Sequence, residues 1–225
     1  MILMIETTAL NCSVALCDNG NTIDCLEVRD DKFAHAEKLH PFIEELLAKN
    51  KLSANSLKAV AVSMGPGSYT GLRIGVSAAK GFAFALGIPM IAVSTLQMMT
   101  DFVKESHQAN VFLPMIDARR MEVYTQRFDE IGSATNAIEA RIIEPDFFQE
   151  KENKILVFGD GADKCLEMMP SNYSIVSGIY PSAVMMAKLS QKAFSDGDFV
   201  DAAYFEPFYL KDFVAGAPST KNKLA

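Results

Sequence analysis

The sequence predicts an α/β protein in which one folding unit is used twice, each half having a mixed β-sheet with flanking helices. Short apolar segments typical of strands alternate with longer amphipathic segments typical of helices. The order of these segments in the first half recurs loosely after residue 110. The 225 residues, of which 49% are hydrophobic, suffice for one large domain or two small ones with a substantial core.

The first half is expected to begin with three antiparallel strands, because Asn19-Gly20 between the second and the third is a strong hairpin turn. A helix with apolar residues on one face follows, and Pro41 is expected in its first turns, where a missing N–H costs little. The predicted elements are strands at residues 2–7, 12–17 and 22–28, a helix at 37–49, a strand at 57–62, a helix at 72–86, a strand at 90–93 and a helix at 95–106.

The second half repeats this order. Its predicted elements are strands at residues 111–116, 122–128, 137–143 and 155–158, a short helix after 159–161, a weak strand at 175–176 and a helix at 182–194. Three antiparallel strands followed by helix, strand, helix and strand form the unit of actin-like ATPase folds, which are ribonuclease H-like. We therefore predict a duplicated actin-like fold with a boundary near residues 106–110, which gives halves at 1–108 and 109–225.

A glycine-rich segment at residues 65–75 is the most informative part of the chain, because it joins a predicted buried strand to a predicted helix. Such a backbone can closely face an anion or another chain. A Walker A loop is excluded, since it needs a lysine and a hydroxyl residue where this chain has Leu72 and Arg73. The dinucleotide fingerprint is excluded because the loop has one residue too many and the next strand ends in Ser94-Thr95, without a carboxylate.

Charge and composition argue against a protein that binds nucleic acid alone, that spans a membrane or that is held together by disulfides. The formal net charge of −7 argues against nucleic-acid binding by this chain alone, and the tail at Lys221 and Lys223 is too short to reverse this. Glycines and Lys80 interrupt the longest apolar run, so no transmembrane helix is predicted. The N-terminus has no signal-peptide features, and the four cysteines have neither metal-ligand nor disulfide spacing. We therefore expect a cytoplasmic protein with reduced thiols and no membrane association.

The helix after the glycine-rich segment is expected to be capped by Ser68, with Thr70 as the alternative cap, because the sequence there is not a Gly-x-Ser-x-Gly nucleophile elbow. Interior glycine is less favourable than alanine by about 1 kcal/mol, so close packing should offset its presence in this helix. The packing partner is either the chain's own sheet or the helix at 37–49, or else the equivalent helix of another subunit. The small residues recur at every fourth position and form a ridge, at Gly71, Gly75, Ala79, Ala83 and Gly87.

Four places in the chain carry a specific likeness to a known family. They are the opening strand pair at residues 2–16, the glycine-rich segment at 65–75, the Asp-Ala-Arg hairpin at 116–124, and the segments 159–162 and 206–211 together. In this combination the chain resembles the bacterial TsaB family over nearly its whole length.

The resemblance implies a role in making threonylcarbamoyl-adenosine next to the anticodon of tRNAs that read codons beginning with A. It implies a non-catalytic subunit that binds and supports TsaD, a catalytic paralogue of similar fold. It also implies that a small ATPase, TsaE, joins them. ATP and a metal ion would then serve the complex, with no cofactor bound by this chain alone and tRNA bound only through the complex.

Differences from the catalytic relatives support this non-catalytic role. The family usually has Asp-Thr after its first strand, and this chain has Glu6-Thr7, which makes nucleotide binding there less favourable. The catalytic relatives carry two histidines one helical turn apart, a spacing that lets them share a metal ion. The corresponding segment at 94–100 has no such ligand, and His35 and His40 are expected on different helix faces, each at the surface or an interface. We therefore expect no catalytic, cofactor-binding or metal-binding residue, and the peptidase interpretation is excluded.

The Asp-Ala-Arg hairpin is expected to be structural. Asp117 and Glu122 are predicted to flank its turn rather than to form a catalytic carboxylate pair. Arg119 and Arg120 would be exposed at the tip, where they are candidates for contact with a phosphate of a nucleotide or tRNA held by the assembly. A stand-alone actin-like ATP-dependent phosphotransferase is the alternative function, but it would need glycines where these arginines stand.

Members of the family pair through helices of the N-terminal half. We therefore expect a pseudo-symmetric interface built from the helix after Gly71 and the helix that begins near Glu37. Such a surface is self-complementary enough for a homodimer when the partner is absent. The candidate contact residues are His40, Ile43, Leu47, Leu72, Arg73, Val76, Ala79, Lys80 and Ala83.

Overall fold

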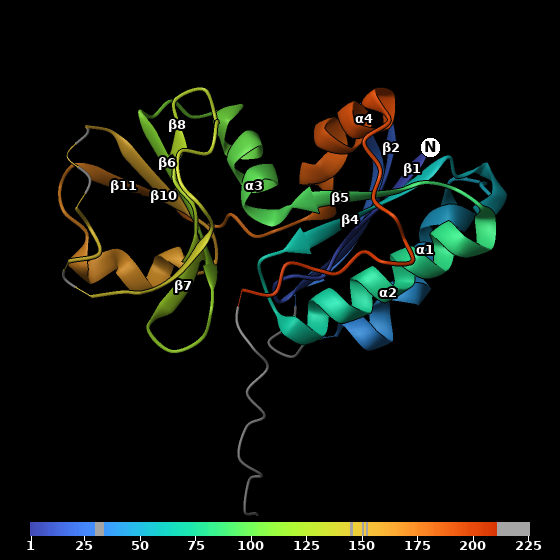
Figure 1. Ribbon diagram of the computed structural model, residues 1–225, viewed down its shortest axis with the longest axis horizontal. Coiled ribbons are helices and arrows are strands. Elements are labelled where there is room, and N and C mark those ends of the chain that lie inside the picture. Colours follow the sequence, from blue (N-terminus) through green and yellow to red (C-terminus); the bar gives the residue numbers. More distant parts are fainter. Residues whose placement is uncertain (30–33, 145, 150, 152, 211–225) are drawn as a thin grey trace, which may run out of the picture.

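The computed structural model describes residues 1–29, 34–144, 146–149, 151 and 153–210. Two mixed β-sheets lie side by side, and helix α3 (Thr95–Lys104) lies between them (Figure 1). The segment at residue 211 and the tail at Lys221 and Lys223 fall outside the described residues. Within the described ranges, no helix combines the length and the apolar composition that crossing a membrane requires.

The first sheet has five strands in the order β3-β2-β1-β4-β5. Strands β2 and β3 form an antiparallel meander with β1, while β4 and β5 run parallel to β1. The elements of this half are β1 (Ile2–Glu6), β2 (Asn11–Asp18), β3 (Asn21–Arg29), α1 (His35–Lys49), the 3₁₀ turn η1 (Ala54–Ser56), β4 (Ala59–Gly65), α2 (Tyr69–Leu86) and β5 (Met90–Ser94).

The second sheet has the order β11-β10-β6-β7-β9, with β8 paired to β6. Its central strand β6 is antiparallel to β7 and parallel to β10, as β1 is antiparallel to β2 and parallel to β4. The elements are β6 (Val111–Asp117), β7 (Glu122–Thr125), β8 (Phe128–Asp129), β9 (Glu139–Ile142), β10 (Ile155–Phe158), η2 (Ala162–Met168), β11 (Tyr173–Val176), η3 (Ala183–Met186) and α4 (Ala187–Asp196). The same strand order and direction in both sheets confirm the predicted duplication.

The two halves differ in their helices, and here the prediction needs correction. In the described part of the second half, the only helical element between its strands is the 3₁₀ segment η2, whereas the first half has α1 and α2. The predicted helix at 182–194 divides into η3 and α4, and both contact the first sheet. A division into 1–108 and 109–225 is therefore not a division in space, since the chain returns to the first sheet after β11.

Several predicted bounds also shift. Helix α1 begins at His35, so Pro41 lies in its second turn, and α2 begins at Tyr69 rather than at residue 72. The predicted strand at 122–128 is divided into β7 and β8 by two residues that leave the ladder. All four cysteines are free; Cys12, Cys17 and Cys165 are buried, and only Cys25 is partly exposed.

Three apolar clusters form the core. One lies between the first sheet and helices α1 and α2, and another covers the far face of the second sheet. The third and largest joins the two sheets, because it contains Met4 and Ile91 from the first, Phe112 and Phe158 from the second, and Met99 from α3. Both sheets therefore share one continuous core.

Candidate functional site: the helical groove and the buried carboxylates

The glycine-rich segment packs against its own chain. Strand β4 ends at Gly65, and Ser68 caps α2, since its hydroxyl accepts a hydrogen bond from the Gly71 N–H at 3.3 Å. The Ser68 N–H in turn donates to the Thr8 carbonyl at 2.6 Å. This confirms Ser68 as the cap and shows that its own backbone N–H faces the turn between β1 and β2.

The glycines of the ridge permit this close approach. A Cβ atom at Gly71 would lie 1.9 Å from the Thr7 carbonyl oxygen, and one at Gly75 would lie 2.3 Å from the Thr7 hydroxyl. The Thr7 hydroxyl also donates to the Gly71 carbonyl at 2.7 Å. Of the alternatives left open by the sequence, the structure therefore supports packing on the chain's own sheet.

The same inward orientation applies to most of the candidate interface residues. The side chains of six of the nine are buried in the core of this chain and are not available to a partner: Ile43, Leu47, Leu72, Val76, Ala79 and Ala83. They occupy the faces of α1 and α2 that pack on the first sheet, where the apolar periodicity placed them. His40 and Arg73 are exposed, and the half-buried Lys80 donates to the Ala203 carbonyl at 3.5 Å.

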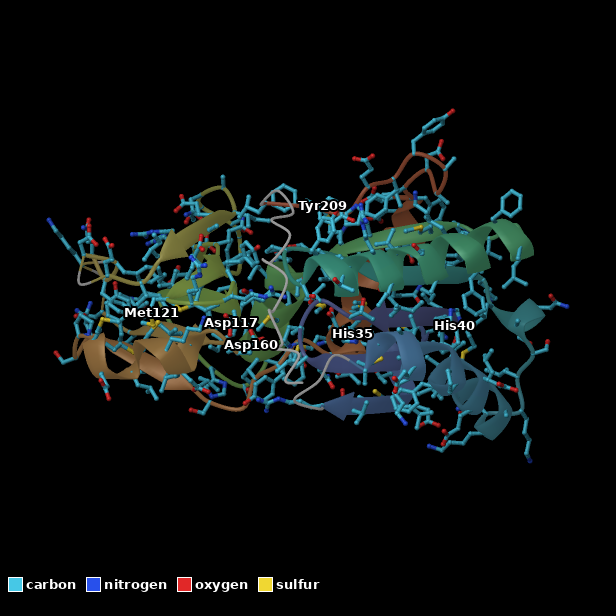
Figure 2. The ribbon with its side chains drawn as sticks, turned by 90° about the horizontal axis from the view of Figure 1, so that it is seen from below. His35, His40, Asp117, Met121, Asp160 and Tyr209 are labelled. Carbon is cyan, nitrogen blue, oxygen red and sulfur yellow. The ribbon has the colours of Figure 1, made fainter. Side chains whose placement is uncertain are left out.

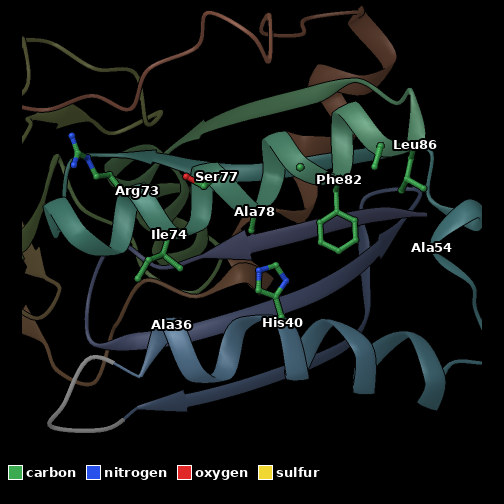
Figure 3. A pocket seen from close by; sticks show the side chains of 11 residues that line it. Ala36, His40, Ala54, Arg73, Ile74, Ser77, Ala78, Phe82 and Leu86 are labelled. Carbon is green, nitrogen blue, oxygen red and sulfur yellow. The ribbon is translucent and has the colours of Figure 1, made fainter.

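A groove lies immediately beside these buried residues, between α1 and α2 (Figure 3). Its volume is about 750 Å³. His40 reaches toward α2 from one side, and Ile74, Ala78 and Phe82 face the space from the other. The full lining consists of Ala36, His40, Ala54, Arg73, Ile74, Ser77, Ala78, Gly81, Phe82, Ala85 and Leu86.

The chemistry of the groove suits an apolar protein segment. Most of its lining is aliphatic or aromatic, and polar side chains come only from His40, Arg73 and Ser77. A Cβ atom at Gly81 would meet nothing within 4 Å, so the space above this residue is open. Grooves between two helices with this character accept an amphipathic helix or a short apolar motif.

Sequence reasoning identified the two helices and only two of the lining residues, His40 and Arg73. A usable signal was present, because α2 is apolar on nearly its whole circumference, with Arg73 and Lys80 as its only charged residues. A helix that is apolar all round has to be covered on both sides. The side that does not face the sheet is the one that lines the groove.

A second candidate site lies at the carboxyl ends of β1 and β10, because the charge of Asp160, just after β10, acts on Glu6 at the end of β1. Figure 2 labels Asp160 and the neighbouring Asp117 near the middle of the molecule. Glu6, at the end of β1, is fully buried, and its Oε1 accepts hydrogen bonds of 2.5 Å from the Thr8 N–H and the Thr8 hydroxyl. Among the described residues, its Oε2 has no hydrogen-bond partner. Burial raises the pKa of Glu6 to about 7, and the nearby charge of Asp160 adds to this.

The residues of this second site do not fit a metal–nucleotide site. Glu6 is held in a setting that favours its neutral form, and burial likewise raises the pKa of Asp160 to about 6. Within the part of the chain that the structure describes, no three His, Cys, Asp or Glu residues are placed to share a metal ion. In the glycine-rich loop, the Ser68 N–H donates to the Thr8 carbonyl and the Gly71 N–H donates to the Ser68 hydroxyl, so neither amide is directed at a phosphate.

The two histidines of α1 have different surroundings. His35 is buried, and its Nε2 lies 2.8 Å from the Ala9 carbonyl. Burial lowers its pKa. The expectation that it lies at a surface or interface is therefore wrong, because the helix starts two residues earlier than predicted and turns this position inward. His40 lies on a different face, at the groove.

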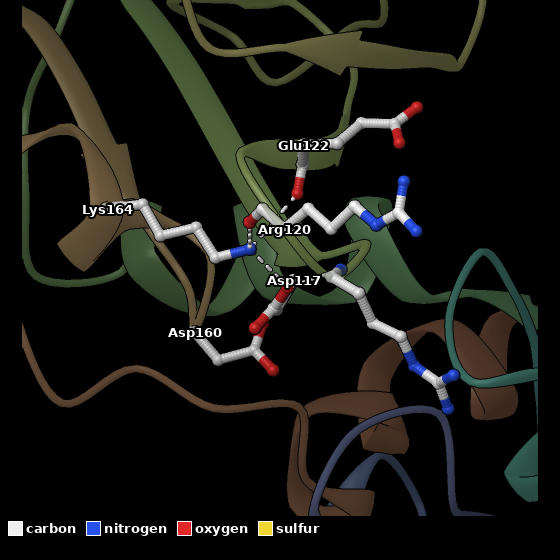
Figure 4. A network of polar contacts seen from close by, with 6 residues as sticks. Asp117, Arg120, Glu122, Asp160 and Lys164 are labelled. Carbon is white, nitrogen blue, oxygen red and sulfur yellow. Dashed lines mark hydrogen bonds and ion pairs between the residues drawn. The ribbon is translucent and has the colours of Figure 1, made fainter. Parts of the chain in front are cut away.

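The Asp-Ala-Arg hairpin joins β6 and β7 and is fixed at its base (Figure 4). Lys164 forms an ion pair with Asp117 and donates to the Arg120 carbonyl at 2.6 Å. Asp160 accepts from the Asp117 N–H at 3.1 Å. Arg119 and Arg120 are exposed at the tip, with positive φ angles of 68° and 50°. The prediction of a structural hairpin turn with exposed arginines is confirmed.

Comparison with known proteins identifies the family to which this chain belongs. A family model described as "TsaD: tRNA N6-adenosine threonylcarbamoyltransferase" matches residues 31–176. The tRNA threonylcarbamoyladenosine biosynthesis protein TsaB of Haemophilus influenzae is 30% identical over 224 residues, which cover 95% of this chain and 94% of that protein. The chain belongs to the TsaB family. The TsaB protein of Escherichia coli is 29% identical over 223 residues, which cover 95% and 96% of the two chains.

Solved structures agree with this TsaB assignment. YeaZ from Pseudomonas aeruginosa has a TM-score of 0.77 and 27% identity, over 93% of this chain and 99% of that one. Another Pseudomonas aeruginosa structure, of a protein described as having similarity to peptidase YeaZ, has a TM-score of 0.79 and 27% identity, over 93% of this chain and 99% of that one. An activator of 2-hydroxyisocaproyl-CoA dehydratase from Clostridium difficile, with bound ADPNP, has a TM-score of 0.51 at 9% identity, which reflects a shared fold alone.

Proposed function

We propose that this chain is a non-catalytic subunit of the cytoplasmic machinery that makes threonylcarbamoyl-adenosine next to the anticodon of tRNAs reading codons beginning with A. In this role it binds and supports a catalytic paralogue of the TsaD family. The observation that carries the proposal is the open apolar groove between α1 and α2, in a chain whose buried carboxyl groups, Glu6 and Asp160, are unsuited to a metal–nucleotide site. The names of the relatives support the pathway.

The groove explains how one fold can bind another of the same kind. A paralogue with equivalent helices can place a helix of its own beside α2, so that two similar helix pairs pack about a pseudo-twofold axis. In the absence of that partner, the same apolar surface can pair with a second copy of this chain. We therefore propose a heterodimer in the assembly and a homodimer when the chain is alone, with contacts through His40, Arg73 and the apolar groove lining rather than through the buried residues.

Binding of the purified chain to the TsaD-family protein of the same organism tests this placement. Gly81→Arg puts a long charged side chain into the groove at a position where a Cβ meets nothing, so the chain should still fold. We expect at least a tenfold loss of affinity, measured by isothermal titration calorimetry. Lys49→Glu, at the exposed end of α1, is the control and should bind normally. Unchanged binding by Gly81→Arg would exclude the groove.

Substitutions at Val76 or Ala79, which the helical pattern of the sequence suggests, do not test the interface. Both side chains are buried in the core of this chain, so Val76→Glu or Ala79→Arg would unfold it and would report nothing about a partner. Analytical ultracentrifugation of Gly81→Arg checks the homodimer in the same way, since a shared surface predicts that both associations fail together.

In the assembly, ATP and a metal ion serve the partner proteins, including a small ATPase of the TsaE type, and tRNA is bound through the complex. Arg119 and Arg120 are proposed to contact a phosphate held there, because both are exposed and, among the described residues, neither forms an ion pair. Calorimetric titration of this chain alone with ATP and Mg²⁺ addresses the phosphotransferase alternative. Micromolar binding would revive that alternative.

A further inference from the structure

The described part of the chain ends beside one mouth of the groove. The Phe208 N–H donates to the Met64 carbonyl at 2.8 Å, which holds this segment at the end of β4. The Tyr209 ring packs on Tyr69, the first residue of α2, with centroids 4.7 Å apart. The Arg73 guanidinium lies over the same Tyr69 ring, 4.4 Å from its centroid, and Arg73 also lines the groove. The stack therefore leads from the end of the described chain to the groove.

The fifteen residues that follow Leu210 carry an apolar pair close to this point. Phe213 and Val214 are the third and fourth residues after Leu210, and three extended residues span about 10 Å. The groove follows α2 from Arg73 to Leu86, a distance of about 20 Å along a helix. Residues 211–225 can extend over about 50 Å, so they are long enough to enter the groove and follow it.

We propose that residues 211–225 bind in the groove between α1 and α2 of the same chain, with Phe213 and Val214 as the apolar anchors. The groove is lined by apolar side chains that match such an anchor, notably Ile74, Ala78 and Phe82, and its volume of about 750 Å³ exceeds what one aromatic side chain needs. The tail also carries a net charge of +2, from three lysines and one aspartate, in a chain whose total is −7. Charge therefore favours its return to the body of the protein.

This occupancy would regulate the site, a consequence that rests on the proposed function of the groove. A short tether gives the tail a local concentration in the millimolar range. At a local concentration of about 4 mM, even a contact with a dissociation constant of about 1 mM keeps the groove about four-fifths occupied. A partner sees only the free fraction, so its apparent affinity is weakened about fivefold. The tail would shield an apolar surface in the free chain and leave it when a partner arrives.

The absence of tryptophan from the chain provides a direct test of docking. Phe213→Trp in the full chain introduces a single reporter at the anchor, and Thr220→Trp is its control. We expect blue-shifted emission for the anchor relative to the control. Adding Gly81→Arg should fill the groove and return the anchor's emission to the control value. Identical emission from the two reporters would overturn the proposal, as would a blue shift that disappears on dilution, because that would indicate docking into a second copy.

Truncation then separates this inference from the proposed function. A chain that stops after Leu210 should bind the TsaD-family partner about fivefold more tightly than the full chain. Phe213→Ser should reproduce most of the gain, and Thr220→Ala should not. If the reporter docks but truncation leaves partner binding unchanged, tail docking stands and the groove is excluded as the partner's site. If the reporter does not dock, the inference fails whatever the partner does.

Discussion

The buried carboxyl group of Glu6 should make the stability of this protein depend on pH in an unusual direction. The pKa of Glu6 is about 7 in the folded chain, against 4.5 for a carboxyl group exposed to water, as in the unfolded chain. Folding is therefore accompanied by uptake of a proton when the pH lies between these two values. Stability from the neutral group is complete below pH 4.5 and is lost as the pH rises through 7. The difference corresponds to about 3 kcal/mol of unfolding free energy at pH 8.

Glu6→Gln removes the ionisation and keeps the geometry. The amide oxygen can still accept from the Thr8 N–H and hydroxyl, which now donate to Oε1. We expect the variant and the parent to be similar near pH 5, and the variant to be more stable by about 2 to 3 kcal/mol at pH 8. Urea unfolding followed by circular dichroism from pH 5 to pH 8 measures this difference.

The comparison of the two proteins at each pH isolates Glu6, together with its coupling to Asp160, from the other titrating groups. The pKa of His35 is also shifted, but His35 is present in both parent and variant and its contribution cancels. Glu45→Gln, at an exposed position of α1, controls for the change in net charge. A stability difference between Glu6→Gln and the parent that stays constant across this range would refute the reasoning, as would a variant that is less stable at pH 8.

Further substitutions test the packing around α2 and the hairpin. Gly71→Ala should lower the unfolding free energy by at least 2 kcal/mol, because its methyl group would overlap a carbonyl oxygen. Gly81→Ala in the same helix should raise the unfolding free energy by about 1 kcal/mol, because its methyl group meets nothing. Chemical denaturation that gave the opposite order of stabilities would contradict the packing. Ser68→Ala should cost about 1 kcal/mol through loss of the helix cap, and an unchanged melting temperature would argue against the cap. Replacing Arg119 by Asn and Arg120 by Gly should keep or raise the melting temperature, since these residues adopt positive φ readily, and a marked loss would show that the arginines stabilise the turn.

Strand order and duplication could be predicted because they follow from local patterns. The Asn19-Gly20 turn fixes the first hairpin, and short apolar runs such as residues 155–158 mark buried parallel strands. The Ser68 cap and the hairpin at Asp117 are also local, since each depends on residues fewer than six apart. The predictions of these features were correct because each depends on residues that are close together in the sequence.

What the sequence could not give depends on contacts between distant residues. The ridge residues Gly71 and Gly75 contact Thr7, which is more than sixty residues away, so periodicity alone could not choose between the sheet and a partner. Helix α4 has an ordinary amphipathic pattern, and nothing in that pattern says which sheet it covers. The groove is a space between two helices, and only the all-round apolar character of α2 hinted that it exists.

The exchange of helices between the halves has a mechanical consequence. Helix α3 comes from the first half and packs on β6, while α4 follows the second half and packs on β5. Each sheet is therefore in contact with a helix that the other half of the sequence supplies, and the two sheets share the largest apolar cluster. A motion that moved the two sheets apart would expose that cluster to water. The molecule should therefore behave as one rigid body and unfold in a single cooperative transition. A displacement of α2 should then be transmitted to the hairpin between β6 and β7.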